Sequence, residues 1–480
     1  MDLHITLTTQ QPVSGAMYGQ IRDGILEGRL RPGSALPSSR ELARSLEVSR
    51  NTVVAVYERL RAEGFVKTRI GAGTFVSDRV RPRMQVERRP SPLRARPVWS
   101  EIPEGLDLSA TSVEFDFRPG IPDASRFPFA AWRARVARQI RPRTIGAGTL
   151  IGAAGHAGLR AAIARHVGLS RAVRASTAEV LITSGSQQAL DLVARVLIEP
   201  GGMVVVEDPG YPLPRRLFRS HGARVVGIPV DDEGLIVDRI PEGTRVVYVT
   251  PSHQYPLGMA MSMGRRQALL AWAERADAAV IEDDYDSEFR YGGRPLESLQ
   301  GLDGSGRVLY VGSFSKSLLP TLRLGFLVAP EPLHSALRKA KHLADWHTTL
   351  PAQAALAELI DDGLLARHIR RMRRIYAERH AAVMEILTRD FSGRLTPLPG
   401  AGGLHLTVLL DERDASCDLA IAERALARGV AVLPLSYHYD GDGARPGFLI
   451  GYGAVAAARI EEGLSRLGSC LLHAELSGHR

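Results

Sequence analysis

The chain contains the stretch Val308-Leu309-Tyr310-Val311-Gly312-Ser313-Phe314-Ser315-Lys316-Ser317, in which four apolar residues run directly into small polar residues and a lysine. Continuous apolar runs of this kind are typical of strands that are buried on both faces of a parallel sheet. Ligands of such sheets bind beyond the carboxyl ends of the strands, which is where Lys316 would lie. A lysine amine can lose its proton and form an imine with an aldehyde, whereas arginine stays charged. The stretch therefore predicts a buried sheet with a reactive amine at its edge.

Four more apolar runs with the same character precede this stretch. They are residues 180–182, 203–206, 246–249 and 279–281. Helical apolar patterns separate them, and strands that alternate with helices are typical of an α/β domain with a mostly parallel sheet. We therefore predict an α/β domain over residues 113–480.

The residues that follow these strands carry distinct chemical groups. In chain order they are Ser186 and Gln187 at a helix start, Tyr211 in a turn, Asp283, Asp284 and Tyr285 after a strand, and then Ser313, Ser315, Lys316 and Arg323. Pyridoxal 5′-phosphate (PLP) needs such a set: a lysine for its aldehyde, N–H groups and an arginine for its phosphate, an aromatic face for its ring and a carboxylate for its pyridine nitrogen. The spacing does not settle whether Asp283 or Asp284 faces that nitrogen, and we predict Asp283.

The positive charge of the chain is concentrated near its start. Residues 1–100 hold 17 lysines and arginines against 9 acidic residues, which accounts for +8 of the formal net charge of +9. A local excess of this kind is expected of a segment that meets a polyanion. The arginine-rich part, 79–97, is interrupted by prolines, so we predict an extended linker over 79–112 between domains at 1–78 and 113–480.

The first of these domains contains two adjacent helix patterns. Ser38 precedes Glu41 by three residues, the spacing of a capping box, and a stripe of apolar residues runs through 53–60. A third helix pattern comes before this pair, and two short strand-like runs joined by Gly71-Ala72-Gly73 come after it. Three helices and a hairpin predict a winged helix-turn-helix, an α+β fold whose second helix of the pair enters the major groove of DNA.

The start of that second helix and the wing carry groups suited to DNA. Hydrogen-bonding side chains at a helix start reach base edges, and cationic side chains around them hold phosphates. The predicted contacts are Arg40, Ser49, Arg50, Asn51, Thr52, Lys67 and Arg69.

Two groups of motifs resemble known families. The motifs Leu36-Pro37-Ser38-Ser39-Arg40-Glu41-Leu42-Ala43 and Ser49-Arg50-Asn51-Thr52-Val53, within residues 13–78, resemble GntR-type bacterial regulators. The motifs Gly185-Ser186-Gln187-Gln188-Ala189-Leu190, Asp208-Pro209-Gly210-Tyr211, Glu282-Asp283-Asp284-Tyr285 and Ser313-Phe314-Ser315-Lys316 are similar to fold-type I PLP aminotransferases. Joined in one chain, they resemble the MocR subfamily over nearly the whole sequence.

The resemblance implies roles for individual residues. Lys316 would form the Schiff base (aldimine) with PLP, Asp283 would face the pyridine nitrogen, Tyr285 would lie by O3′ and Tyr211 would stack on the ring. The phosphate would be surrounded by Ser186, Gln187, Ser313, Ser315 and Arg323. The resemblance also implies large and small subdomains within 113–480 and a two-fold homodimer.

Three positions depart from the aminotransferase pattern. Tyr255-Pro256-Leu257-Gly258 stands where those enzymes commonly have Asn-Pro-Thr-Gly, and Leu449 stands where they hold the substrate carboxylate with an arginine, for which Arg445 is a conjectural substitute. Leu150 replaces a tyrosine that reaches the neighbouring subunit's cofactor. Because efficient transamination needs a rigidly held substrate, these changes favour ligand sensing over turnover, although a transaminase half-reaction stays open.

The sequence thus predicts a PLP-dependent bacterial transcription regulator that binds double-stranded promoter DNA and senses an amine, an amino acid or a vitamin B6 species. The alternative from another class is an active aminotransferase with an accessory DNA-binding domain. A third alternative keeps DNA binding but treats the large domain as an empty dimerisation module.

Composition excludes several other classes. No apolar run approaches the roughly 20 residues that span a bilayer, and two cysteines suggest no disulfide framework, so we expect a cytoplasmic protein without membrane contact. The fourteen histidines show no ligand spacing, so we predict no metal site. Of the four lysines, Lys339 and Lys341 are expected to be incidental residues on an exposed helix.

Overall fold

The computed structural model describes residues 5–6, 12–69, 71–80, 93–103, 113–142, 152–291, 297–400, 402–411, 418–441 and 443–472. The chain divides into two compact units, Met1–Ala95 and Arg96–Arg480. This division falls within the predicted linker 79–112, of which 81–92 and 104–112 lie outside the described residues. The exact limits of that linker stay a prediction. Each unit is described by itself.

The first unit is a three-helix domain with a hairpin. Its elements are α1 (Val13–Leu26), α2 (Ser39–Ser45), α3 (Arg50–Ala62), β1 (Val66–Arg69) and β2 (Gly73–Val76), with β1 and β2 antiparallel. The apolar stripe of α3 is buried against Met17 and Ile21 of α1. The predicted winged helix-turn-helix is therefore confirmed.

Side-chain caps fix where α2 and α3 begin. The Oγ of Ser38 accepts a hydrogen bond from the Glu41 N–H at 3.2 Å, and the Glu41 carboxylate accepts one from the Ser38 N–H at 2.9 Å. This is the predicted capping box. The Oγ of Ser49 caps α3 in a similar way by accepting from the Thr52 N–H at 3.1 Å. The second helix of the pair therefore begins at Arg50 and presents its first turn outward.

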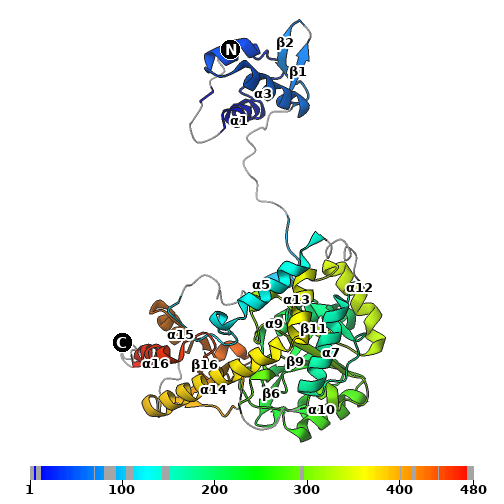
Figure 1. Ribbon diagram of the computed structural model, residues 1–480, viewed down its shortest axis with the longest axis vertical. Helices are drawn as coiled ribbons and strands as arrows, with labels where there is room; N and C mark the ends of the chain where they lie inside the picture. The colour runs from blue at the N-terminus through cyan, green and yellow to red at the C-terminus, as the bar shows by residue number, and fades with distance from the viewer. Residues whose placement is uncertain are drawn as a thin grey trace. The chain divides into compact units, whose positions relative to one another are not determined.

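An eight-stranded sheet forms the centre of the second unit (Figure 1). Its strands are β4 (Val180–Thr183), β5 (Met203–Asp208), β6 (Arg224–Asp231), β7 (Gly234–Leu235), β8 (Thr244–Val249), β9 (Ala279–Asp284), β10 (Val308–Ser313) and β11 (Gly325–Val328). They are arranged in the order β4-β11-β10-β9-β8-β5-β6-β7. The five strands from β10 to β6 are mutually parallel, whereas β11 is antiparallel to both its neighbours. All five predicted strands are present.

Helices cover both faces of this sheet because successive strand residues point to opposite sides. Val180 and Ile182 pack in a cluster with residues of α7, α13 and α14, whereas Leu181 packs with residues of α8, α9 and α12. The helices of the unit are α4 (Val98–Glu101), α5 (Phe129–Gln139), α7 (Ala157–Arg171), α8 (Ser186–Leu197), α9 (Pro212–Ser220), α10 (Met263–Arg275), α11 (Leu299–Leu302), α12 (His334–Asp345), α13 (Leu350–Asp361), α14 (Leu364–Asp390), α15 (Asp418–Ala427) and α16 (Ile460–Leu472).

A smaller lobe follows the long helix α14. Its antiparallel sheet contains β12 (Leu395–Pro397), β13 (His405–Leu410), β16 (Gly447–Gly451) and β15 (Leu433–Pro434), and β3 (Phe115–Asp116) pairs with β14 (Val430–Ala431) beside it. Phe448 and Ile450 of β16 enter the core of this lobe. The other face of the sheet meets the large lobe, where the Thr407 hydroxyl donates to the Pro256 carbonyl at 2.6 Å. The expected large and small subdomains of fold type I are therefore present.

One segment connects the small-lobe sheet to the long helix α14. The carbonyl of Phe117 accepts from the Gly451 N–H at 2.7 Å, and the Asp123 carboxylate pairs with Arg379 of α14 at 2.5 Å. We call residues 117–123 the strap. Among the described residues, no helix is both long and apolar enough to cross a membrane.

Candidate cofactor site and nucleic-acid interface

The predicted anion-binding residues meet at one edge of the large sheet. Ser313 at the end of β10 is paired with Gly325 of β11, and Gly325 is paired with Thr183 at the end of β4. The turn that follows β4 leads into α8 at Ser186, and no side chain of the described residues caps that helix start. The first N–H groups of α8 are thus available to an anion.

Arg323 lies against this helix start. Its Nη2 donates to the Ser184 carbonyl at 2.7 Å, and a Cβ added to Gly185 would approach its guanidinium to 3.0 Å. The Ser315 N–H donates to the Ser313 hydroxyl at 3.2 Å, which places both serines at the same edge. The structure therefore brings Ser186, Gln187, Ser313, Ser315 and Arg323 to one edge of the sheet, with a positive charge and open N–H donors.

The amine of Lys316 lies under the strap. A Cβ at Gly120 would come within 2.5 Å of the Lys316 Nζ, and the φ of +74° at this position favours glycine. Burial lowers the pKa of the amine, and this effect outweighs the opposite influence of Asp286 and Asp283. A lysine whose pKa is lowered by burial is a better nucleophile towards a carbonyl carbon.

Asp283 and Asp284 face opposite sides of the sheet because they are neighbours on β9. The Asp284 carboxylate accepts from the Arg171 guanidinium at 2.7 Å and from the Tyr310 hydroxyl at 2.6 Å. Burial alone would raise the pKa of Asp284, but these partners outweigh it and the pKa is lowered. Asp284 is thus already engaged in a buried ion pair.

Asp283 has an oxygen free on the other side. One carboxylate oxygen accepts from the Tyr248 hydroxyl at 2.8 Å, and Oδ1 is buried without a hydrogen-bond partner among the described residues. The Oδ1 of Asp284 also has no such partner, but the charge of Asp284 is paired with Arg171, whereas no cation is paired with Asp283 among the described ion pairs. Burial raises the pKa of this carboxyl to about 7. A protonated ring nitrogen is the kind of partner that such an oxygen lacks, so the residues present fit a pyridine cofactor.

The two predicted aromatic residues lie beside this carboxylate and amine. The Tyr285 hydroxyl donates to the His253 carbonyl at 2.9 Å and is also 2.9 Å from the His253 Nδ1. The Tyr211 ring is half-buried at the start of α9, with its centroid 5.2 Å from that of the Tyr255 ring. Tyr255 therefore fills space near the position where aminotransferases commonly have asparagine.

Leu449 of β16, at the position where aminotransferases commonly have an arginine, lies in an apolar cluster. Its side chain is fully buried and packs in one cluster with Leu257, Leu433 and Leu435. Arg445 is exposed and precedes β16 in the chain. The structure therefore gives no support to the prediction that Arg445 takes the role of the arginine that aminotransferases have where this chain has Leu449. Leu150 lies outside the described residues.

The prediction that Lys341 is an incidental lysine on an exposed helix is wrong. Its side chain is completely buried, and its Nζ donates to Gln188 at 2.5 Å, to Asp345 at 2.9 Å and to Thr348 at 3.1 Å. The Gln188 oxygen also accepts from the Ser184 N–H at 2.8 Å. The amine thereby fixes the turn that begins α8. Only Lys339 is exposed, as expected.

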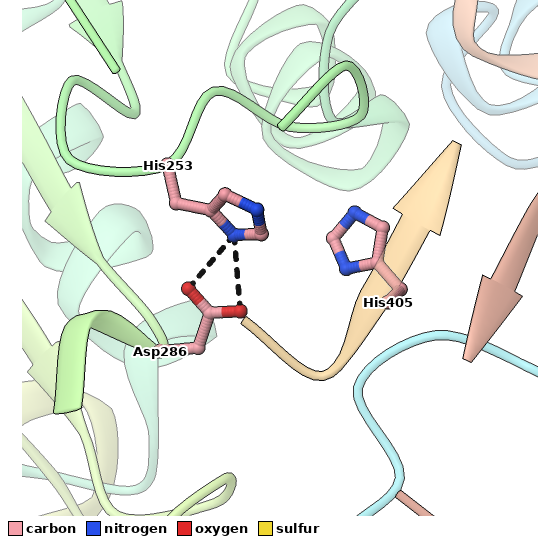
Figure 2. A group of neighbouring side chains, drawn as sticks. All are labelled: His253, Asp286 and His405. Atoms are coloured by element: carbon pink, nitrogen blue, oxygen red, sulfur yellow. Dashed lines mark hydrogen bonds and ion pairs between the residues drawn. The ribbon is translucent and has the colours of Figure 1, made fainter. Parts of the chain in front are cut away.

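A cluster of polar side chains beside Tyr285 was also missed from the sequence. His253, Asp286 and His405 come from three separate segments, are all buried, and bring one polar atom each within 4.8 Å of one another. Figure 2 shows the His253 ring turned towards the Asp286 carboxylate, with His405 opposite on strand β13. Spacing along the chain gave no signal because the two histidines belong to different lobes.

The predicted DNA contacts lie at the helix starts and on the wing of the first unit. Arg40, Ser49, Arg50 and Asn51 are exposed, Thr52 is half-buried, and the Nε of Arg50 is 3.5 Å from the Ser39 hydroxyl of α2. Lys67 on β1 pairs with Asp78, and the Arg69 guanidinium lies 5.1 Å from the centroid of the Phe75 ring. The exposed first turn of α3 therefore presents the cationic side chain of Arg50 and the amide side chain of Asn51. The positive charge of Lys67 is partly neutralised by Asp78.

Comparison with known families matches both parts of the chain. Residues 123–466 match the family of class I and II aminotransferases, and residues 14–76 match the gntR family of bacterial regulatory proteins. The "Probable rhizopine catabolism regulatory protein MocR" of Rhizobium meliloti is 36% identical, with 97% of this chain and 95% of the relative covered. The chain belongs to the MocR subfamily of GntR-type transcriptional regulators.

Two further proteins resemble this MocR-type chain. The pyridoxine biosynthesis transcriptional regulator PdxR of Corynebacterium glutamicum is 35% identical over 94% of this chain and 95% of the relative. The solved structure of α-aminoadipate aminotransferase from Thermus thermophilus, complexed with N-(5′-phosphopyridoxyl)-L-leucine, has a TM-score of 0.69 and 32% identity over 75% of this chain and 93% of its own. The MocR-type chain thus shares the fold of enzymes that bind a phosphopyridoxyl group.

The different environments of the two aspartates predict different effects of the same substitution. Asp284→Asn leaves the Arg171 guanidinium buried without its negative partner, and we expect the free energy of unfolding to fall by about 3–5 kcal/mol. Asp283→Asn keeps the acceptor for Tyr248 and removes a buried carboxyl. Urea unfolding of the cofactor-free full-length protein measures both effects.

The matched Asp283→Asn variant also has a defined pH dependence. Because the pKa of Asp283 in the folded protein, about 7, exceeds its ordinary value, this carboxyl stabilises the fold most at low pH, and that contribution is lost as the pH rises through 7. The variant should therefore become progressively more stable than the wild type between about pH 4 and pH 7. If the free energies of unfolding of the variant and the wild type differ by the same amount across this pH range, the burial of the Asp283 charge is contradicted.

Proposed function

We propose that this protein is a bacterial transcription regulator that binds promoter DNA through its N-terminal domain and senses a small amine, amino acid or vitamin B6 species through PLP held at Lys316. The observation that carries the proposal is the buried Oδ1 of Asp283, which has no hydrogen-bond partner in the part of the chain that the structure describes and belongs to the same site as a lysine amine with a lowered pKa. Membership of a family of regulators supports the DNA-binding part.

Each residue of the site would contact a different group of the cofactor. Lys316 would hold its aldehyde carbon, Asp283 its ring nitrogen, and Tyr285 its phenolic oxygen. Tyr211 would cover one face of the ring. The phosphate would occupy the start of α8, with Ser186, Gln187, Ser313, Ser315 and Arg323 as its donors. When bound, PLP supplies an electron-withdrawing ring conjugated to the lysine-bound carbon, which reacts with amines.

A ligand that reacts at Lys316 would also meet the strap. Gly120 is so close to the Nζ that a change at this amine must be accommodated by residues 117–123 or by the lysine itself. The strap continues in sequence from the predicted linker, which leads to the DNA-binding domain. Differential affinity of the ligand for two strap positions would couple the amine site to DNA binding.

The buried Leu449 favours sensing over efficient catalysis. An uncharged side chain at this place cannot fix a substrate carboxylate, so proton transfer to a held substrate would be slow. The alternative, an active aminotransferase with an accessory DNA-binding domain, is favoured by the fold that the chain shares with α-aminoadipate aminotransferase. Multiple turnover of an amino acid with 2-oxoglutarate would support that alternative.

The proposal extends to a homodimer in the bacterial cytoplasm. Winged helices commonly read paired half-sites, which a two-fold dimer matches, and promoter DNA is located in that compartment. No metal ion is needed for the proposed chemistry.

Replacement of the reactive amine tests the sensor. In Lys316→Ala, the visible absorbance of the PLP-loaded protein should vanish, and promoter binding should no longer respond to added amine, since no covalent link to the cofactor can form. Absorbance spectra and promoter-fragment shifts measure the two effects. Lys339→Ala, which removes an exposed lysine, is the matched control and should retain both properties. An amine response that survives in Lys316→Ala would contradict the proposal.

Replacement of an exposed arginine at the start of α3 tests the DNA contact. Arg50→Ala should weaken binding to the promoter fragment by about 1–3 kcal/mol, because a cation at the groove is lost, and should leave the visible absorbance unchanged. Arg61→Ala, at the opposite end of the same helix, should bind nearly as the wild type does. Equal binding by the two variants would show that the first turn of α3 does not contact DNA.

A further inference from the structure

His253 and Asp286 form a buried pair next to the proposed cofactor site. The His253 Nδ1 lies 3.0 Å and 3.1 Å from the two carboxylate oxygens of Asp286. A carboxylate accepts, so the Nδ1 carries the proton and donates. The Tyr285 hydroxyl lies 2.9 Å from the His253 carbonyl, to which it can donate, and 2.9 Å from the same Nδ1. The His253 Nδ1 is therefore in contact with both Asp286 and Tyr285, and Figure 2 shows it facing the Asp286 carboxylate.

The small lobe is shaped to admit this pair. A Cβ at Gly403 would collide with Cε1 of His253 and lie 2.7 Å from an oxygen of Asp286, and Gly403 has a φ of +83°. The Gly403 carbonyl is held by the hydroxyl of Tyr452 at 2.9 Å, and its N–H donates to the Phe289 carbonyl at 2.9 Å. The backbone of one lobe is thus fixed against the side-chain pair of the other.

The pair acts on the reactive amine by charge. Burial has the largest influence on the pKa of Lys316 and lowers it, and of the charges around the amine Asp286 raises that pKa most, ahead of Asp283. Arg323 lowers it further. His405, which faces His253 from β13 with ring centroids 5.1 Å apart, has a pKa well below its ordinary value because it is buried, and so it is neutral.

We propose that His253 and Asp286 are a positioning pair that keeps a negative charge beside the Lys316 amine and holds the Tyr285 hydroxyl in place. This inference rests on the proposed function, in which the Lys316 amine reacts with the aldehyde of PLP. In this account the Nδ1–H of His253 supplies the hydrogen bond that the buried Asp286 carboxylate needs, because a buried charge without a donor is unfavourable. The pair thereby sets the pH range in which Lys316 is a free amine and can condense with an aldehyde.

The test follows the reactivity of Lys316 in the full-length protein without cofactor. Trinitrobenzenesulfonate reacts with neutral amines, and peptide mass mapping separates Lys316 from the three other lysines of the chain. The fraction modified is measured against pH, with the exposed Lys339 as internal reference. This readout needs neither bound cofactor nor DNA, so its failure is distinguishable from failure of the proposed function.

Asp286→Asn removes the negative charge, so the midpoint of the Lys316 titration should move down by about one pH unit, a tenfold increase in free amine at a given pH below the midpoint. His253→Leu removes the donor and should shift the midpoint in the same direction. His253→Asn keeps an N–H near the Nδ1 position and should restore the wild-type midpoint. Asp362→Asn, which neutralises an exposed carboxylate paired with Arg135, is the charge-matched control and should have no effect.

Three results would overturn the inference. The first is a wild-type midpoint in Asp286→Asn, with folding verified by circular dichroism. The second is a midpoint in His253→Asn that follows His253→Leu, which would mean that the N–H is not what matters. The third is binding of one equivalent of Zn²⁺ to the wild-type protein, lost in Asp286→Asn, which would make the cluster a metal site. In the cofactor-loaded protein, the pH dependence of the visible absorbance should shift in the same direction as the amine titration in Asp286→Asn.

Discussion

The amine of Lys316 must share a buried space with the carboxylates of Asp283 and Asp286. Burial disfavours the ammonium form and the two carboxylates favour it, and the balance leaves the pKa of the amine below its ordinary value. The surrounding structure is arranged around this balance. Glycines at 120 and 403 let the strap and the small lobe approach without a side chain, and the strand ends of the large sheet supply the charged groups. The two lobes are therefore fixed around one reactive nitrogen.

The same arrangement explains why the site suits a sensor. Within the described ranges, one oxygen of Asp283 has no hydrogen-bond partner and no side chain caps the start of α8, and Arg323 adds a positive charge at the sheet edge. These groups can hold a cofactor firmly. On the predicted substrate side, however, Leu449 stands where aminotransferases commonly have an arginine, and it packs in an apolar cluster with Leu257. Firm cofactor binding with weak substrate fixation favours a reversible response over turnover.

Much of this could be predicted from the sequence because its patterns are local. Apolar runs gave the five strands, the Ser38 and Glu41 spacing gave a helix start, and the strand-end motifs gave the residues around Lys316. The spacing did not settle the choice between Asp283 and Asp284, for which Asp283 was predicted; alternation along β9 separates the two once Arg171 is known to hold Asp284. Lys341 and the His253–Asp286–His405 cluster were missed because burial and contact between distant segments are properties of the tertiary fold. Lys341 was wrongly predicted to be exposed because nothing near it in the chain reveals Gln188 and Thr348 as its partners.

The central claim is that Lys316 carries PLP covalently in a protein that binds promoter DNA. Borohydride reduction of the PLP-saturated protein, followed by peptide mass mapping, tests it most directly. The account predicts one phosphopyridoxyl group on the peptide that contains Lys316 and none on those with Lys339 or Lys341. An unmodified Lys316, or a label on Lys341, would contradict it.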